Sequence, residues 1–211
     1  MTRGDAGAPL VAVLDYGIGN LRSAQKALEA VGADARLTAD RGLVADADAV
    51  VLPGVGAFGR CAEALGRAGL DEVAVDAIDA GRPFLGICVG MQLLYESSEE
   101  SPGVAGLGVL PGEVGRLRPG VKHPQMQWNV LERRGDSLML NGADDPVWVY
   151  FVHSYAAPDG DAVVATCDYG GPVPALVERD NLWATQFHPE KSGAVGLGLL
   201  ATFVSYAGVR R

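Results

Sequence analysis

The sequence predicts an α/β protein with an open, mainly parallel, doubly wound sheet. Helices are expected on both faces, with an antiparallel portion appended in the C-terminal half. Two observations support this fold class. In the first half, short apolar runs alternate with helical patterns over short connections, which is typical of parallel strands joined by helices. After Glu96, short strand-like runs are separated by proline, glycine and charged turns, which favours antiparallel pairing.

The first half supplies the parallel strands of the predicted sheet. Strand-like apolar runs occupy residues 10–14, 35–38, 49–52 and 83–87. Apolar residues at helical spacing predict helices over residues 21–31, 57–65 and 70–80, and a further helical pattern follows residue 88. Functional loops lie at the carboxyl ends of parallel strands. We therefore expect three loops, residues 15–20, residues 53–58 and the turn at residue 88, to converge on one rim.

The second half supplies the antiparallel portion. Strands are predicted over residues 112–117, 126–132, 147–155, 162–167, 175–178 and 182–186. Asp180 and Asn181 fit a two-residue hairpin turn between the last two strands. Apolar spacing over residues 193–206 predicts a closing helix.

Composition bounds the function. The chain has 211 residues, of which 48% are hydrophobic and 20% charged, so we expect one domain over residues 10–211. Residues 1–9 lack the apolar core of a signal peptide and are expected to be a flexible tail of a cytoplasmic protein. A net charge of -9 argues against nucleic acid and anionic membranes as partners. Three widely spaced cysteines suit neither a disulfide framework nor a metal site.

The strongest chemical signal is the segment FLGICVGMQLL at residues 84–94. It predicts a strand, a tight turn and a helix, with Cys88 at the tip, like the serine elbow of α/β-hydrolases. Gly86 and Gly90 leave room for that turn. Free N–H groups at the start of a helix would favour the thiolate. We therefore predict that Cys88 is a nucleophile, and that Cys61 and Cys167 are buried structural residues.

A cysteine nucleophile needs a base, and the segment FHPE at residues 187–190 offers one. His188 ends a predicted strand, and Glu190 is close enough to turn back and fix the tautomer of the imidazole. His153, in the segment YFVHSY, is the competing base. It lacks a nearby carboxylate, so we expect its segment to line the substrate site instead.

Acyl transfer also needs donors for the oxyanion. The backbone N–H of Val89, directly after the nucleophile, is one candidate. The second is expected from the loop containing Gly54, Val55 and Gly56, because glycines let the backbone approach or flip without steric penalty. The loop at residues 15–20 resembles a phosphate-binding turn, but it lacks the third glycine of a dinucleotide site, so no cofactor is expected.

These segments carry a resemblance to a known family. PGVGAF at residues 53–58, GICVGMQ at residues 86–92 and FHPE together resemble class I, triad-type glutamine amidotransferases. Three further segments resemble, more narrowly, the glutaminase subunit of imidazole glycerol phosphate synthase. They are DYGIGNL at residues 15–21, YFVHSY at residues 150–155 and ATQFHPEKSG at residues 184–193. The resemblance extends over residues 10–206.

The resemblance implies a reaction and a partner. Such subunits hydrolyse L-glutamine to glutamate and ammonia, with no cofactor or metal. The implied partner is a (β/α)8-barrel cyclase subunit, bound in a heterodimer. It uses the ammonia with a phosphoribulosyl-formimino-carboxamide nucleotide to make imidazole glycerol phosphate and aminoimidazole carboxamide ribotide in histidine biosynthesis.

The resemblance also implies roles for single residues. Cys88 attacks the glutamine amide, His188 transfers the proton and Glu190 orients His188. Glutamine is expected to be held by Gly54, Gln92, Ser154 and Tyr155. The mouth facing the barrel is expected to contain Asn20, Trp128, Tyr150 and Lys191.

One segment departs from the family pattern. The pattern P-H-M-G-W-N reads PQMQWN at residues 124–129, so Gln125 and Gln127 replace a histidine and a glycine. A glutaminase subunit for a different synthase therefore stays open. So do a stand-alone cysteine γ-glutamyl hydrolase, the glutaminase domain of an anthranilate-, guanylate- or cytidylate-forming enzyme, and a non-catalytic binding module. The last would have no need to keep Cys88, His188 and Glu190 together.

Overall fold

The computed structural model describes residues 7–209. Its main strands are β1 (Leu10–Leu14), β2 (Asp34–Thr38), β3 (Ala49–Gly54), β4 (Phe84–Cys88), β7 (Gln125–Val130), β9 (Trp148–His153), β11 (Val163–Asp168), β12 (Pro172–Arg179) and β13 (Leu182–Thr185). Shorter strands are β5 (Ser97–Ser98), β6 (Glu113–Arg116), β8 (Glu132–Arg133) and β10 (Tyr155–Ala156). The helices are α1 (Leu21–Ala30), α2 (Arg41–Asp46), α3 (Phe58–Arg67), α4 (Leu70–Asp79), α5 (Val89–Gln92), the 3-10 turn η1 (Pro189–Lys191) and α6 (Gly193–Val209).

A sheet of eight strands forms the centre of the molecule, in the order β2-β1-β3-β4-β13-β12-β11-β8. The first five strands in this order are parallel, and the other three pair antiparallel. This arrangement confirms the predicted fold class. Strand β13 lies in the half of the sequence predicted to be mainly antiparallel, yet it pairs in parallel with β4. The hairpin after β12 reverses the chain and inserts β13 beside the elbow strand.

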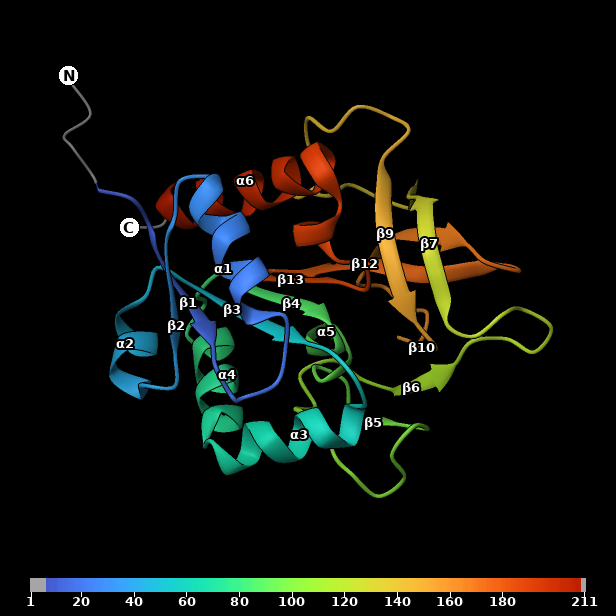
Figure 1. Ribbon diagram of the computed structural model, residues 1–211, viewed down its shortest axis with the longest axis horizontal. Coiled ribbons are helices and arrows are strands. Elements are labelled where there is room, and N and C mark those ends of the chain that lie inside the picture. Colours follow the sequence, from blue (N-terminus) through green and yellow to red (C-terminus); the bar gives the residue numbers. More distant parts are fainter. Residues whose placement is uncertain (1–6, 210–211) are drawn as a thin grey trace.

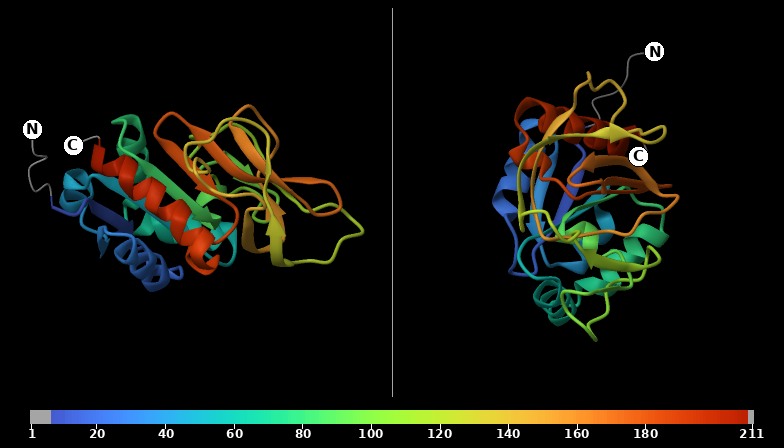
Figure 2. Two further views of the ribbon diagram at one scale, coloured as in Figure 1. Left: turned by 90° about the horizontal axis from the view of Figure 1, so that it is seen from above. Right: turned by 90° about the vertical axis from the view of Figure 1, so that its right-hand side faces the viewer.

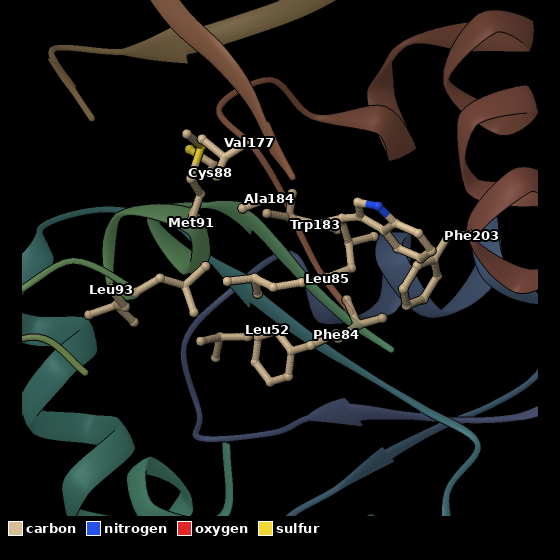
Figure 3. Close-up of a cluster of buried hydrophobic side chains, with 14 of the residues drawn as sticks. Leu52, Phe84, Leu85, Cys88, Met91, Leu93, Val177, Trp183, Ala184 and Phe203 are labelled. Atoms are coloured by element: carbon tan, nitrogen blue, oxygen red, sulfur yellow. The ribbon is translucent and has the colours of Figure 1, made fainter. Parts of the chain in front are cut away.

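Helices cover both faces of this sheet (Figure 1). Helices α1 and α6 lie on one face, and α3 and α4 lie on the other. Every residue of β3, β4 and β13 is buried, as expected of strands covered on both sides. Figure 3 shows how Trp183 of β13 reaches Phe203 of α6, with their ring centroids 5.3 Å apart. The same view places Cys88 at the end of the buried strand that begins at Phe84.

Two smaller sheets lie at the end of the molecule where β4 finishes. Strands β7 and β9 form an antiparallel pair, and β10, β6 and β5 form a three-stranded sheet. Figure 2 shows the yellow strand β7 and its light-orange partner β9 beyond the parallel strands. The backbone N–H of His188 donates to the carbonyl of Tyr150 at 3.0 Å, which joins β9 to the exit of β13. The small sheets therefore form one wall of the rim where the parallel strands end.

Several predicted elements differ from those observed. Helix α2 was not predicted, because six residues are too few to show a periodic pattern; the side chain of Asp40 caps it by accepting from the backbone of Leu43. The helix after Cys88 is a single turn. The strand predicted over residues 126–132 is interrupted at Leu131, and the one over 147–155 at Ser154. The Asp180-Asn181 hairpin is confirmed, with Asp180 in a left-handed conformation at φ 55°.

The terminal predictions are only partly covered by the structure. Residues 1–6 lie outside the described residues, so the flexible tail over residues 1–9 stays a prediction, as does the single domain over residues 10–211. Within residues 7–209, no helix combines the length and the apolar character needed to span a bilayer.

Candidate active site

Cys88 sits on a strained turn at the end of β4. Its φ of 55° is rare for a residue with a side chain, and it is followed directly by the single turn of α5. Glycines make the turn possible. A Cβ on Gly90 would collide with the carbonyl oxygen of Leu52, and a Cβ on Gly86 would lie 2.9 Å from the carbonyl oxygen of Gly90. The geometry is that of the predicted nucleophile elbow.

His188 and Glu190 reach this elbow from the neighbouring strand. Because β13 is parallel to β4, its carboxyl end opens at the same rim, and His188 follows it three residues later. The turn η1 then directs Glu190 back, so that its Oε1 lies 2.8 Å from His188 Nδ1. Both side chains are buried, with 2% and 3% of their surface exposed. Such a bond fixes the ring orientation and leaves Nε2 for chemistry.

Burial by itself lowers the pKa of His188. The interactions with Cys88 and Glu190 outweigh it and raise the pKa to about 9. Within residues 7–209, His188 Nε2 is buried and has no hydrogen-bond partner. The ring therefore has an unused nitrogen and a strong affinity for a proton beside a thiol. This arrangement can accept the proton of Cys88 and later release it to a leaving group.

A chain of amide side chains connects the nucleophile to the opposite wall. Gln186 Nε2 lies 3.7 Å from Cys88 Sγ, and Gln186 Oε1 accepts from Gln92 Nε2 at 3.0 Å. Gln92 Nε2 also donates to the carbonyl of Tyr155 at 2.9 Å. Gln92 and Tyr155 were predicted site residues, whereas Gln186 was not. Nothing in its sequence context distinguishes a buried polar linker from an ordinary strand residue.

A cavity of about 520 Å³ opens above Cys88. Most of the predicted site residues line it, namely Asn20, Val55, Cys88, Val89, Gln92, Ser154, Tyr155, His188 and Lys191. Glu190 lies behind His188, and Gly54 lies beneath the elbow, where a Cβ would be 2.7 Å from the backbone nitrogen of Gly90. Trp128 and Tyr150 do not line the cavity; they contact each other edge to face, with ring centroids 6.1 Å apart.

Hydrogen bonds fix the candidate oxyanion loop on either side of the Gly54–Val55 peptide group. The Tyr16 hydroxyl donates to the carbonyl of Pro53 at 2.6 Å, and the Cys61 thiol donates to the carbonyl of Val55 at 3.3 Å. The Gly54–Val55 peptide lies between these two anchored carbonyls. Cys61 was predicted to be only structural, and Tyr16 was not singled out. Their hydrogen bonds to the loop form because the end of β1, the end of β3 and α3 pack together, and local sequence patterns do not reveal such packing.

Glu100 is a further cavity residue that sequence reasoning missed. Its Oε2 accepts from the backbone N–H of Phe58 at 2.7 Å, and its side chain lines the same cavity as Cys88. In the sequence it lies in a polar, turn-rich segment, where a carboxylate usually faces solvent. Only the fold brings it to the active-site rim.

No metal-binding cluster accompanies the site. Across residues 7–209, no group of three or more histidine, cysteine or acidic side chains is arranged to hold an ion.

Comparisons with known proteins agree with this geometry. Residues 12–204 match the family described as glutamine amidotransferase class-I. The imidazole glycerol phosphate synthase subunit HisH of Methanothermobacter thermautotrophicus is 53% identical over 196 residues, which cover 92% of this chain and 98% of that protein. The HisH subunit of Deinococcus radiodurans is 52% identical over 200 residues, covering 93% of each chain.

Solved structures show the same fold at lower sequence identity. A crystal structure of a glutamine amidotransferase superposes with a TM-score of 0.74 at 23% identity, covering 94% of this chain and 98% of the other. The structure of PurLQS from Thermotoga maritima gives 0.71 at 20% identity, covering 96% and 98%. The chain therefore belongs to the class I glutamine amidotransferase family and, within it, to the HisH subunits of imidazole glycerol phosphate synthase.

Proposed function

We propose that this protein hydrolyses L-glutamine and delivers the ammonia to a (β/α)8-barrel cyclase subunit in histidine biosynthesis. The observation that carries the proposal is that Cys88 and His188 line one cavity, with Glu190 behind His188 and its Oε1 2.8 Å from His188 Nδ1. The chain shares 53% and 52% sequence identity with two HisH subunits, which supports the choice of pathway.

The proposed reaction begins with attack of Cys88 Sγ on the side-chain amide carbon of glutamine. His188 Nε2 takes the thiol proton, and the developing oxyanion is bound by backbone N–H groups of Val89 and Val55. His188 then gives its proton to the leaving nitrogen, so that ammonia departs and a thioester remains. Water attacks the thioester with His188 again acting as base, which releases glutamate and restores the thiol. Glu190 stabilises the imidazolium at each step.

The cavity offers groups suited to the rest of glutamine. Glu100 is a carboxylate on the cavity wall, and we assign it to the α-ammonium group of the substrate. Gln92, Ser154 and Tyr155 line the same cavity, and Gln92 donates to the carbonyl of Tyr155. They would hold the amino-acid head group, while Gly54 permits close approach of the backbone at the reacting end.

The mouth of the cavity is suited to a protein partner. Asn20 and Lys191 line the cavity, and Trp128 packs against Tyr150 at the strand pair β7 and β9. Trp128 is 48% exposed, and its neighbour Met126 is 63% exposed, which is unusual for large apolar side chains. We call Asn20, Trp128, Tyr150 and Lys191 the docking face. A barrel subunit seated there would close the mouth and receive ammonia without loss to solvent.

Dependence on the partner would arise at the Gly54–Val55 peptide. Its neighbouring carbonyls are fixed by Tyr16 and Cys61, so rotation is confined to this one unit. A glycine-flanked peptide can rotate at little cost, and its orientation decides whether the N–H of Val55 faces the oxyanion. We infer an enzyme of one amidotransferase domain over residues 10–211, acting in the cytoplasm as one half of a heterodimer.

The test combines the purified protein with the cyclase subunit of an imidazole glycerol phosphate synthase. Glutamine hydrolysis should be much faster with the cyclase and its nucleotide than without them. Cys88→Ala should lower glutamine-dependent synthesis roughly 10³-fold or more. Synthesis from ammonium salts should stay within about twofold of the wild type, because the cyclase reaction is separate. Loss of both activities would contradict the proposal.

The same assay separates the alternatives. Equal glutamine hydrolysis with and without the cyclase would instead indicate a stand-alone hydrolase. Activation by a different synthase, and not by the cyclase, would indicate another pathway. A non-catalytic module would hydrolyse glutamine under neither condition.

A further inference from the structure

Gln125 is a buried polar residue that the proposed mechanism does not use. It is the first residue of β7, its side chain is fully buried, and it lies directly opposite His153 in the pairing of β7 with β9. The side-chain oxygen Oε1 of Gln125 lies 3.1 Å from His153 Nε2, and its nitrogen Nε2 lies 3.6 Å from Cys167 Sγ. A buried amide between two titratable groups must match the proton arrangement of both.

His153 has a defined proton arrangement. Its Nδ1 lies 2.8 Å from the carbonyl oxygen of Tyr155, which can only accept, so Nδ1 carries the ring proton. Burial, with a smaller contribution from the nearby His188, lowers the pKa of His153 to about 4, against the opposing effect of the Tyr155 hydrogen bond. The ring is therefore neutral at neutral pH, and its Nε2 carries a lone pair.

The orientation of the Gln125 amide follows from this lone pair. Only an NH₂ group can donate to the lone pair of His153 Nε2, so we infer that the Gln125 amide is turned by about 180°, with its nitrogen at His153 and its oxygen at Cys167. This turn exchanges the two amide atoms and leaves the shape of the side chain unchanged. Burial raises the pKa of the Cys167 thiol to about 11, so the thiol keeps its proton at neutral pH and can donate it to the amide oxygen in this orientation. Both ring nitrogens of His153, both ends of the Gln125 amide and the Cys167 thiol then each have a hydrogen-bond partner.

This chain of hydrogen bonds continues into the glutamine pocket. The carbonyl oxygen of Tyr155 accepts from His153 Nδ1 and also from Gln92 Nε2 at 2.9 Å. Gln92 in turn reaches Gln186, whose amide nitrogen is 3.7 Å from Cys88 Sγ. The strand β7, which carries Trp128 of the docking face, is thus connected to the wall of the cavity through Gln125.

We propose that Gln125 is a positioning residue for the glutamine pocket. Its amide N–H holds His153 as the neutral Nδ1–H tautomer, and His153 in turn fixes the Tyr155 carbonyl and the Gln92 amide. Gln125 itself does not line the cavity, so it acts through His153. The effect on catalysis rests on the proposed glutaminase function, whereas the tautomer of His153 does not depend on it.

The first test is nitrogen-15 NMR of the imidazole rings in the wild-type protein at pH 7. The chain has three histidines, so His123→Gln and His188→Asn variants assign the signals of His153. The expected pattern is a protonated Nδ1 and an unprotonated, hydrogen-bonded Nε2. In Gln125→Met the Nε2 signal should move further downfield, because its donor is lost. A protonated Nε2 in the wild type, or an unchanged Nε2 signal in the variant, would overturn the proposal.

The second test measures glutamine hydrolysis in the complex at saturating cyclase. Removal of one buried hydrogen bond should raise KM for glutamine about three- to tenfold in Gln125→Met, with kcat within about twofold. Gln25→Met is the matched control. It removes a side-chain amide whose nitrogen donates a hydrogen bond of 3.0 Å to the carbonyl of Ala35, and Gln25 does not line the cavity. Its KM should equal that of the wild type.

The outcomes distinguish the inference from the proposed function. An inactive wild-type complex would refute the glutaminase function, and the NMR pattern would still decide the tautomer. An active wild type with an unchanged KM in Gln125→Met would refute the positioning role alone. If Gln125→Met does not fold, Gln125→His, which keeps a ring N–H donor, takes its place and should retain a KM within about threefold of the wild type. A larger rise would contradict the proposal that a donor at this position is sufficient to hold His153.

Discussion

His153 and His188 line the same cavity and are both buried, yet their surroundings drive their pKa values in opposite directions. His188 faces the Glu190 carboxylate and the Cys88 thiol, which overcome burial and raise its pKa to about 9. His153 faces a backbone carbonyl and an amide, and burial lowers its pKa to about 4. Burial alone thus favours the neutral ring of His153, whereas the acid and the thiol beside His188 favour its protonated ring despite burial.

The largest expected difference between the two histidines is in catalysis. His188→Gln should lower kcat for glutamine hydrolysis roughly 10³-fold or more, because the proton acceptor is lost. His153→Gln should change kcat/KM by about tenfold or less, because only a wall contact is lost. Steady-state kinetics of the complex measures both. Similar losses in kcat would show that the two rings share the role of base.

The two histidines should also affect stability in opposite pH ranges. Both titrate near pH 6.5 when unfolded. The folded chain holds the His188 proton more tightly, so this stabilisation is fully present below pH 6.5 and is lost as the pH rises through about 9. The folded chain binds a proton on His153 less tightly, so its penalty grows as the pH falls from 6.5 to about 4. Each effect is on the order of 3 kcal/mol.

Urea unfolding between pH 4 and pH 9.5 measures these contributions as differences from the wild type. In His188→Gln, the free energy of unfolding should fall less as the pH rises toward 9, and its change between pH 6.5 and pH 4 should match the wild type. In His153→Gln, the free energy of unfolding should fall less as the pH drops from 6.5 toward 4, and its change at alkaline pH should match the wild type. Parallel pH profiles for both variants would contradict the assigned pKa directions.

A smaller effect is expected at the candidate oxyanion loop, which lines the same cavity. Tyr16→Phe removes the hydroxyl that anchors the Pro53 carbonyl, and should lower kcat about three- to tenfold with little change in KM. Tyr169→Phe is a matched control, because it removes a similar hydroxyl bond, of 2.7 Å, to the carbonyl of Lys122 on the surface. Equal kcat in the two variants would show that the loop does not need the Tyr16 anchor.

Much of this site could be predicted from local sequence. Gly86 and Gly90 flank Cys88 because the elbow leaves no space for side chains; at Gly86 the close atoms belong to the elbow itself, and at Gly90 they belong to Leu52 of the neighbouring strand β3. Glu190 lies two residues after His188, so that pairing is local too. The fold class followed from alternating strand and helix patterns, which short connections turn into a parallel sheet.

The residues that were missed depend on contacts distant in the sequence. Tyr16 meets Pro53 across 37 positions, and Gln186 meets Cys88 across 98. Glu100 reaches the cavity by accepting from Phe58, 42 positions away. The parallel pairing of β13 with β4 follows from the insertion of β13 between β4 and β12. Local sequence patterns do not predict this strand order, because it depends on the packing of the whole sheet.

The most direct test of the contrast between the histidines is labelling by an electrophilic glutamine analogue, read by mass spectrometry of the complex. Three cysteines, Cys61, Cys88 and Cys167, compete for the reagent, and all are free and buried. The account predicts one adduct, on Cys88, prevented by excess glutamine. Labelling should be at least about 100-fold slower in His188→Gln and near the wild-type rate in His153→Gln. An adduct on another cysteine, or equal slowing in the two variants, would contradict it.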